Sequence, residues 1–140
     1  MNVFELPFNK HIGLEKSSNQ DYLLMLNNKK EYLNHLETVH ASALFALAEA
    51  TSGYFLLNEF QDLDNILPVV RTVETKYKKP AQGMVFSKAN FVEVDKEKVL
   101  EELNTKQRTL IIVRVQLYDS QENNVMQSDF QWFIAKRNRY

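Results

Sequence analysis

One carboxylate stands in the middle of the most apolar stretch of the sequence. His40–Leu57 reads HASALFALAEATSGYFLL, and Glu49 is the only acid in it. A carboxyl group among small and apolar residues has a raised pKa and can act as a general base or a nucleophile. The pattern therefore marks Glu49 as a candidate catalytic group.

The neighbours of Glu49 on a helix would be small. The stripe that contains Glu49, together with its flank, consists of Ser42, Ala46, Gly53, Phe45 and Ser52. Such a stripe lets another backbone or a ligand approach closely, and for a ligand the candidate substrate-binding residues are Ser42, Phe45, Ser52 and Gly53. The alternative is that Glu49 is solvated or pairs with an arginine such as Arg71 or Arg114, because burying an unpaired carboxylate is costly.

Other patterns indicate less chemistry. The three histidines, His11, His35 and His40, lack the spacing of a metal site, so no bound metal is expected. Thr51–Gly53 lies inside the helix and is not a nucleophile elbow, and no glycine-rich phosphate loop is present. The start of the helix, at Ala41, instead offers free backbone N–H groups with partial positive charge.

The elements around this helix predict an α+β fold. A long helix is expected over Val39–Leu57, and a short amphipathic helix over Asp95–Gln107 with Val99, Leu100 and Leu103 on one face. Long strands are expected at Ile66–Lys79, Gly83–Val94, Arg108–Ser120 and Val125–Arg137. A helical turn should end near Gly13, and Leu14–Tyr32 should hold two short strands with a tight reversal at residues 27–30. Because the long helix is apolar nearly all round, a sheet should wrap it.

Composition limits the classes of function. The chain has 140 residues, a length that predicts one domain over residues 1–140. The net charge is -1 and there is no cysteine, so neither a nucleic acid nor an anionic membrane is an expected partner, and thiol chemistry is excluded. The first ten residues do not resemble a signal peptide, and the expected location is cytoplasmic. The basic tail at residues 135–140 is read as a solvated terminus.

Three residues of the chain have the spacing of a known signature. Asn34, His40 and Glu49 resemble the signature of hotdog-fold thioesterases of the phenylacetate-pathway type, in which an Asn precedes a His-Gly-Gly and a following Asp or Glu. The stretch ETKYKKPAQG, with Tyr77, resembles the family strand that follows, and FNKHIGLE resembles the family's start. The resemblance covers roughly residues 6–136.

This resemblance implies a fold and an activity. A curved antiparallel sheet would wrap one long central helix, and chains would associate as a homodimer or a dimer of dimers with acyl-CoA at the interface. Glu49 would be the base or nucleophile for thioester hydrolysis, and the Ala41 N–H would polarise the carbonyl. Asn34 would orient water or substrate, His40 would shape the site, and Tyr77 would contact the substrate. Coenzyme A, as part of the substrate, would be the only cofactor-like group.

The chain also departs from the family pattern. Glu37 stands where the family prefers glycine, and Ala41 and Ser42 replace Gly-Gly. Their side chains narrow the approach of a thioester, although a backbone N–H donates whatever the side chain is. The alternative function is therefore an acyl-CoA or acyl-carrier binding module without catalysis. A hotdog dehydratase is less consistent with the sequence, since its histidine and partner acid are not evident.

Overall fold

A computed structural model of the chain describes residues 1–137, so the last three residues of the basic tail lie outside the described range. The helical elements are η1 (Val3–Glu5), α1 (Pro7–Ile12), η2 (Lys30–Tyr32), α2 (Ala41–Glu59) and α3 (Lys96–Lys106). The strands are β1 (Glu15–Lys16), β2 (Leu24–Leu26), β3 (Ile66–Tyr77), β4 (Val85–Phe91), β5 (Arg108–Asp119) and β6 (Asn124–Lys136). They form a six-stranded sheet in the order β1-β2-β4-β5-β6-β3, with every neighbouring pair antiparallel.

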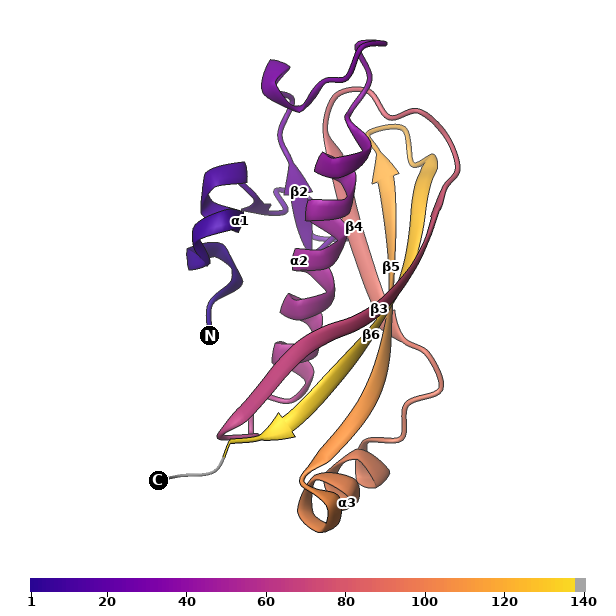
Figure 1. Cartoon of the computed structure of the whole chain (residues 1–140). Coiled ribbons are helices and arrows are strands. Elements are labelled where there is room, and N and C mark those ends of the chain that lie inside the picture. Colours follow the sequence, from indigo (N-terminus) through magenta and orange to yellow (C-terminus); the bar gives the residue numbers. More distant parts are fainter. Residues whose placement is uncertain (138–140) are drawn as a thin grey trace.

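The sheet curves around α2, and the N-terminal elements η1 and α1 lie on the other side of this helix (Figure 1). Buried residues occur on all sides of α2, as expected for a helix that is apolar nearly all round. This arrangement confirms the predicted α+β class and the hotdog architecture of one long helix wrapped by a curved antiparallel sheet.

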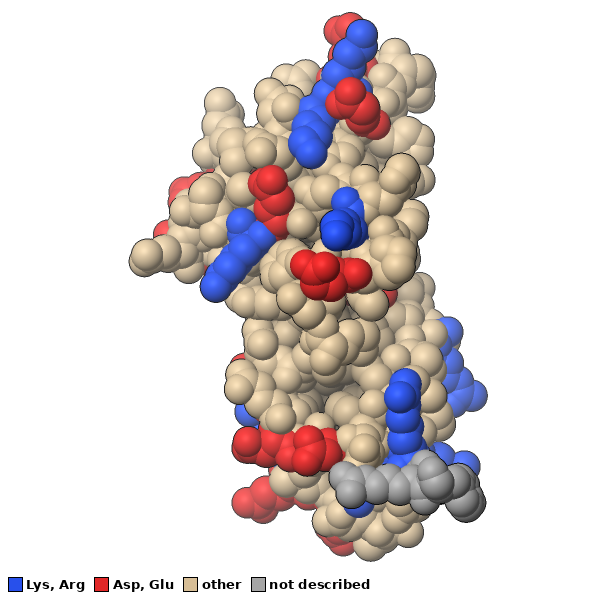
Figure 2. All heavy atoms as spheres, turned by 90° about the vertical axis from the view of Figure 1, so that its left-hand side faces the viewer, with Lys and Arg blue, Asp and Glu red and all other residues tan. Residues whose placement is uncertain are grey.

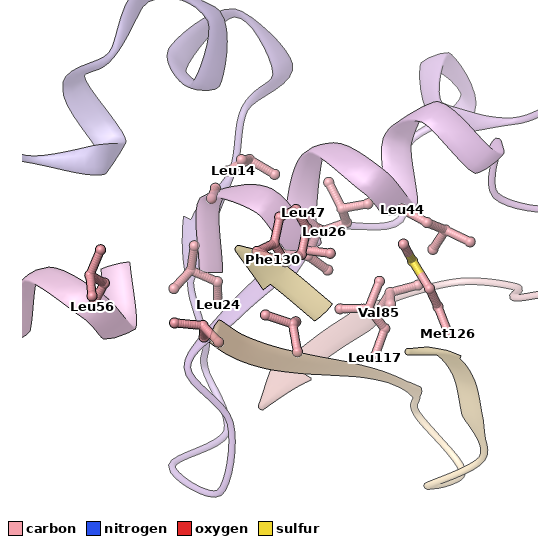
Figure 3. Close-up of a cluster of buried hydrophobic side chains, with 14 of the residues drawn as sticks. Leu14, Leu24, Leu26, Leu44, Leu47, Leu56, Val85, Leu117, Met126 and Phe130 are labelled. Atoms are coloured by element: carbon pink, nitrogen blue, oxygen red, sulfur yellow. The ribbon is translucent and has the colours of Figure 1, made fainter. Parts of the chain in front are cut away.

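The core lies between α2 and the concave face of the sheet. Figure 3 shows Leu44 and Leu47 of α2 with Val85, Leu117 and Phe130 of three strands. β6 alternates as its sequence predicts, and its buried face consists of Met126, Ser128, Phe130, Trp132 and Ile134. β4, β5 and β6 therefore present a largely apolar surface to the helix.

A buried hydroxyl pair fixes the rotation of α2 against the sheet. Thr51 Oγ1 lies 2.7 Å from Ser87 Oγ on β4, and Ser87 Oγ accepts the Leu24 N–H at 3.1 Å. Both hydroxyls are fully buried, and each has a further backbone partner, Leu47 O for Thr51 and Leu24 for Ser87. Residues two positions apart on a helix point in nearly opposite directions. Glu49 therefore faces away from β4.

Three sequence-based details need correction. The β1–β2 reversal occurs at residues 17–23, where Ser17 N–H bonds to Leu23 O, whereas residues 27–30 lead into η2. Tight reversals and 3-10 starts favour similar polar residues, so the prediction at residues 27–30 was wrong. On α3, Val99 and Leu103 are buried as predicted, but Leu100 is 41% exposed. α2 begins at Ala41 because Val39 is still extended, with its N–H bonded to Ala81 O.

Candidate active site

The start of α2 is capped by His40. Its Nδ1 accepts the Ser42 N–H at 2.9 Å, so a neutral imidazole carries its proton on Nε2. The His40 backbone N–H donates to Tyr32 O at 2.7 Å, which holds the cap against η2. Within residues 1–137 the Ala41 N–H has no hydrogen-bond partner, and Ala41 is exposed. The first turn of the helix therefore presents one free backbone donor to its surroundings.

Asn34 holds the loop that leads into this cap. Its Oδ1 accepts the N–H groups of Leu36 at 2.9 Å and Thr38 at 3.1 Å, and its Nδ2 donates to Thr38 Oγ1 at 2.9 Å. Glu37, in the same loop, has a φ of 61°. Only glycine adopts such a left-handed backbone without strain, which explains the glycine of the family pattern at this position. The Asn34 amide is thus engaged in positioning the helix start.

Tyr77 connects β3 to the same place. It is the last residue of β3, and its hydroxyl donates to Ala41 O at 3.4 Å. Half of its surface is exposed, and burial of the rest raises the pKa of its phenol. Tyr77 therefore contacts Ala41 directly, next to the His40 cap. Asn34 holds the loop that precedes this cap.

Glu49 lies elsewhere, in a half-buried position without a charged partner among the described residues. Burial alone raises the pKa of its carboxyl group. The alternative pairing with Arg114 is wrong, because that guanidinium binds Asp129 through two hydrogen bonds of 2.8 and 3.0 Å. The proposed pairing with Arg71 is absent as well within residues 1–137. Glu49 is thus an unpaired acid in partly apolar surroundings.

A small pocket opens beside Glu49. We call it the Glu49 pocket; its lining comprises Met1, Val3, Leu6, Asn9, Glu49, Ala50, Gly53, Leu56, Leu57, Pro68 and Trp132. Its volume is about 40 Å³, enough for a few atoms. Apart from Glu49 and Asn9, the lining carries apolar side chains. The sequence patterns pointed to Glu49 and Gly53 but missed the N-terminal residues, whose short helix carries no periodic signal.

The remaining candidate binding residues take up different positions. Ser52 is fully buried, donates to Glu49 O at 2.7 Å and accepts the Trp132 Nε1–H at 3.2 Å. Phe45 packs on Phe130 with ring centroids 5.8 Å apart. Gly53 lies where an added Cβ would be 3.5 Å from the Trp132 ring, and Ser42 is exposed beside the cap. Ser52 therefore supports the pocket through Trp132, Gly53 lines it directly, and Phe45 packs in the core away from it.

The helix start and the Glu49 pocket do not meet within one chain. Eight residues separate Ala41 from Glu49, a rise of about 12 Å along the helix axis. None of Asn34, His40 and Ala41 lines the Glu49 pocket. A carbonyl that accepts the Ala41 N–H therefore cannot also contact Glu49 of the same helix. The spacing of the two residues on one helix already implies this separation.

Comparison with family models matches residues 11–134 to the domain of unknown function DUF4442. The chain belongs to the DUF4442 family. No curated protein matches this DUF4442 protein. Among solved structures it is similar to a protein of unknown function from Pseudomonas aeruginosa, described as a probable thioesterase, at 24% identity over 96% of this chain and 91% of that one, with a TM-score of 0.77.

Two further structures extend the similarity. A thioesterase from Haemophilus influenzae has 12% identity, covers 99% of this chain and 89% of its own, and gives a TM-score of 0.75. A Bacillus halodurans protein solved with CoA has 20% identity, covers 79% of this chain and 69% of its own, and gives a TM-score of 0.64. The resemblance to the hotdog thioesterase superfamily is thereby confirmed at the level of fold.

Two searches of the described residues give negative results. Residues 1–137 contain no group of three or more His, Cys, Asp or Glu placed to hold a metal ion. No helix in this part of the chain has the length and hydrophobicity needed to cross a membrane.

Proposed function

We propose that this DUF4442 protein hydrolyses acyl-CoA thioesters. The observation that carries the proposal is Glu49, an unpaired carboxylate with a raised pKa beside an apolar pocket. A free backbone donor at Ala41 supplies the second group that the reaction needs. The similarity in fold to a protein solved with CoA supports CoA as the carrier. The proposal includes no cofactor besides the CoA of the substrate. It also assigns the reaction to the cytoplasm.

The two groups come together when two chains pair. β3 is an edge strand, and Leu67, Val69 and Val73 are 42%, 46% and 37% exposed on it. Its Pro68 end lines the Glu49 pocket, and its Tyr77 end touches Ala41. Antiparallel pairing of two β3 edges about a two-fold axis puts the Pro68 end of one chain beside the Tyr77 end of the other. Glu49 would then face the partner subunit's Ala41, and a homodimer is the smallest complete unit.

The proposed chemistry uses one proton acceptor and one donor. The thioester carbonyl oxygen accepts the Ala41 N–H, which stabilises the negative charge that develops on it. Glu49 takes a proton from water as the water oxygen attacks the carbonyl carbon, or attacks that carbon itself and forms an anhydride that water then opens. The C–S bond breaks, and CoA leaves as a thiolate that is then protonated. Asn34 and His40 act by holding the helix start. The role of Asn34 in orienting water or substrate stays a prediction.

The second candidate is acyl-CoA or acyl-carrier binding without hydrolysis. Ala41 and Ser42 are exposed and carry side chains where the family pattern has glycines. The Ser42 N–H is already bonded to His40, so one free donor is left at the helix start. A site with a single donor stabilises the oxyanion less than one with two.

Hydrolysis of a panel of acyl-CoAs decides between the two functions. We expect the wild type to release CoA, and Glu49→Gln to lower kcat by at least about a hundredfold, as loss of a general base does. Glu59→Gln is the matched control, because Glu59 lies on the same helix but pairs with Lys96 at 2.6 Å. Binding without CoA release by the wild type would favour the binding module, and full activity of Glu49→Gln would overturn the role of Glu49.

A further inference from the structure

The N-terminal segment, residues 1–12, closes one side of the Glu49 pocket, and the proposed chemistry gives it no role. Met1, Val3, Leu6 and Asn9 of this segment line the pocket together with Glu49. A buried contact orders the segment internally: Asn9 is 4% exposed, and its Nδ2 donates to Val3 O at 3.0 Å. The N-terminal segment is therefore a built wall of the pocket.

Aromatic packing and a hydroxyl fix the wall to the rest of the molecule. The Phe4 ring meets the Tyr54 ring of α2 edge-on at 5.7 Å, and the Tyr32 hydroxyl donates to Ile12 O at the other end of the segment. Figure 2 shows the face that carries this segment, where an uncharged band separates the upper from the lower charged side chains. An apolar group can therefore reach this face without displacing charged side chains.

The pocket combines polar and apolar side chains. Glu49 and Asn9 supply the polar side chains, and Leu57, Pro68 and Trp132 are among the apolar ones. A thioester whose carbonyl lies beside Glu49 can thus place its carbon chain against an apolar lining. The pocket of about 40 Å³ has room for only the first carbons of such a chain.

Two large apolar residues of the N-terminal segment make a natural comparison. Leu6 lines the Glu49 pocket and is 37% exposed, whereas Phe8 is 62% exposed and does not line it. Leu6 has few neighbours to lose, so its replacement changes the pocket more than the core. Gly53 lines the same pocket, and an added methyl there would lie at an ordinary contact distance of 3.5 Å from Trp132.

We propose that Leu6, on the N-terminal wall, sets the length of the acyl group that the Glu49 pocket accepts, with Gly53 as a second contact. The inference rests on the proposed function, because it names the substrate range of the same site. Short straight-chain acyl groups fit the pocket of about 40 Å³, and longer ones meet the Leu6 side chain.

The test measures kcat/KM for acetyl-, butanoyl-, hexanoyl-, octanoyl- and decanoyl-CoA with the full chain. Leu6→Ala should raise the ratio of octanoyl- to acetyl-CoA hydrolysis by about tenfold or more, the effect of a few methylenes in an apolar pocket. Leu6→Phe and Gly53→Ala should shift the optimum toward acetyl-CoA. Phe8→Ala, the matched control, should leave the profile unchanged, and thermal melting checks that each variant is folded.

The outcomes separate this inference from the proposed function. If the wild type is active but both Leu6 variants keep its chain-length profile, Leu6 does not limit the acyl group and hydrolysis still stands. The same conclusion follows if Phe8→Ala shifts the profile as much as Leu6→Ala. If the wild type hydrolyses none of the panel, the proposed function fails, and the role of Leu6 is tested by measuring acyl-CoA binding in calorimetry. The same change in chain-length preference, measured as Kd, supports that role. An unchanged preference, or no binding at all, overturns it.

Discussion

The two halves of the candidate site differ in which part of the chain does the chemistry. At the start of α2 the free group is the backbone N–H of Ala41, while the side chains of Asn34 and His40 are both hydrogen-bonded. In the Glu49 pocket the free group is a side chain, and the backbone N–H and C=O groups around it are paired in hydrogen bonds of the helix. Residue identity therefore matters at Glu49, whereas backbone geometry matters at the helix start.

The energetic situation of the two halves differs as well. The helix start is exposed, so water solvates its free donor when no substrate is bound. The Glu49 carboxylate is half-buried without a charged partner, and its ionised form loses solvation. The ionised Glu49 carboxylate thus destabilises the folded state, whereas the exposed Ala41 N–H has very little effect on stability. A pattern of this kind is common where activity needs a destabilised group.

The largest expected effect comes from removing the backbone donor. Proline is well tolerated at the first position of a helix, and His40, with φ of -59° and ψ of 140°, already has the extended geometry that a following proline requires. Ala41→Pro should therefore keep the fold and lower kcat by about a hundredfold to a thousandfold, the effect of losing one oxyanion donor. Ala41→Gly keeps the N–H and is the control that should retain activity.

Mixing two inactive variants tests whether the halves come from different chains. In a dimer of Ala41→Pro with Glu49→Gln, one site combines the intact Glu49 of the first chain with the intact Ala41 of the second. Random mixing should restore about a quarter of the wild-type activity, because half of the dimers are mixed and each has one intact site of two. Continued inactivity after subunit exchange would place both groups in one chain.

Stability and activity should depend on pH in opposite ways because of Glu49. Burial raises its pKa above the ordinary value of 4.5, so the folded state binds this proton more tightly than the unfolded state does. Stability should therefore fall as pH rises from 4.5 through the raised pKa, and Glu49→Gln should raise the Tm at pH 7. Activity should change in the opposite direction, because the base works only when ionised: kcat/KM should fall as pH drops through the same range.

Two measurements check this opposition. Thermal melting of wild type and Glu49→Gln across pH should show Tm values that converge at low pH and separate at neutral pH. The kcat/KM profile of the wild type should have its acidic limb within the window where the two Tm curves separate. Identical Tm curves across the range would mean that the carboxylate costs the fold nothing.

Much of the fold follows from local patterns. The alternating pattern of β6 predicts a half-buried strand. The pattern of α2, which is apolar nearly all round, predicts a helix surrounded by other elements. The reversal predicted at residues 27–30 is wrong because the polar residues there suit both a reversal and the start of η2. Leu100 is exposed although it shares a helical face with Val99, so the apolar pattern of α3 did not predict burial residue by residue.

The candidate site was predictable only in part. Glu49 stands out by its polarity, and the helix start by its spacing from Asn34 and His40. Leu6 and Asn9 could not be found in this way, because their place beside Glu49 results from contacts between segments some forty residues apart. The distance between the two halves, by contrast, follows from their spacing on one helix.

The smallest expected effect tests whether the helix start depends on backbone geometry. Glu37 has a φ of 61°, a conformation that costs residues with a side chain about 1–2 kcal/mol. Glu37→Gly should raise the free energy of unfolding by about 0.5–1 kcal/mol, since part of the gain is offset by the entropy of the unfolded glycine. Glu37→Ala removes the same charge but keeps the Cβ, so urea denaturation should show no comparable gain. If both variants gain equally, charge and not backbone strain governs this loop, and the helix start then depends on its side chains as the Glu49 pocket does.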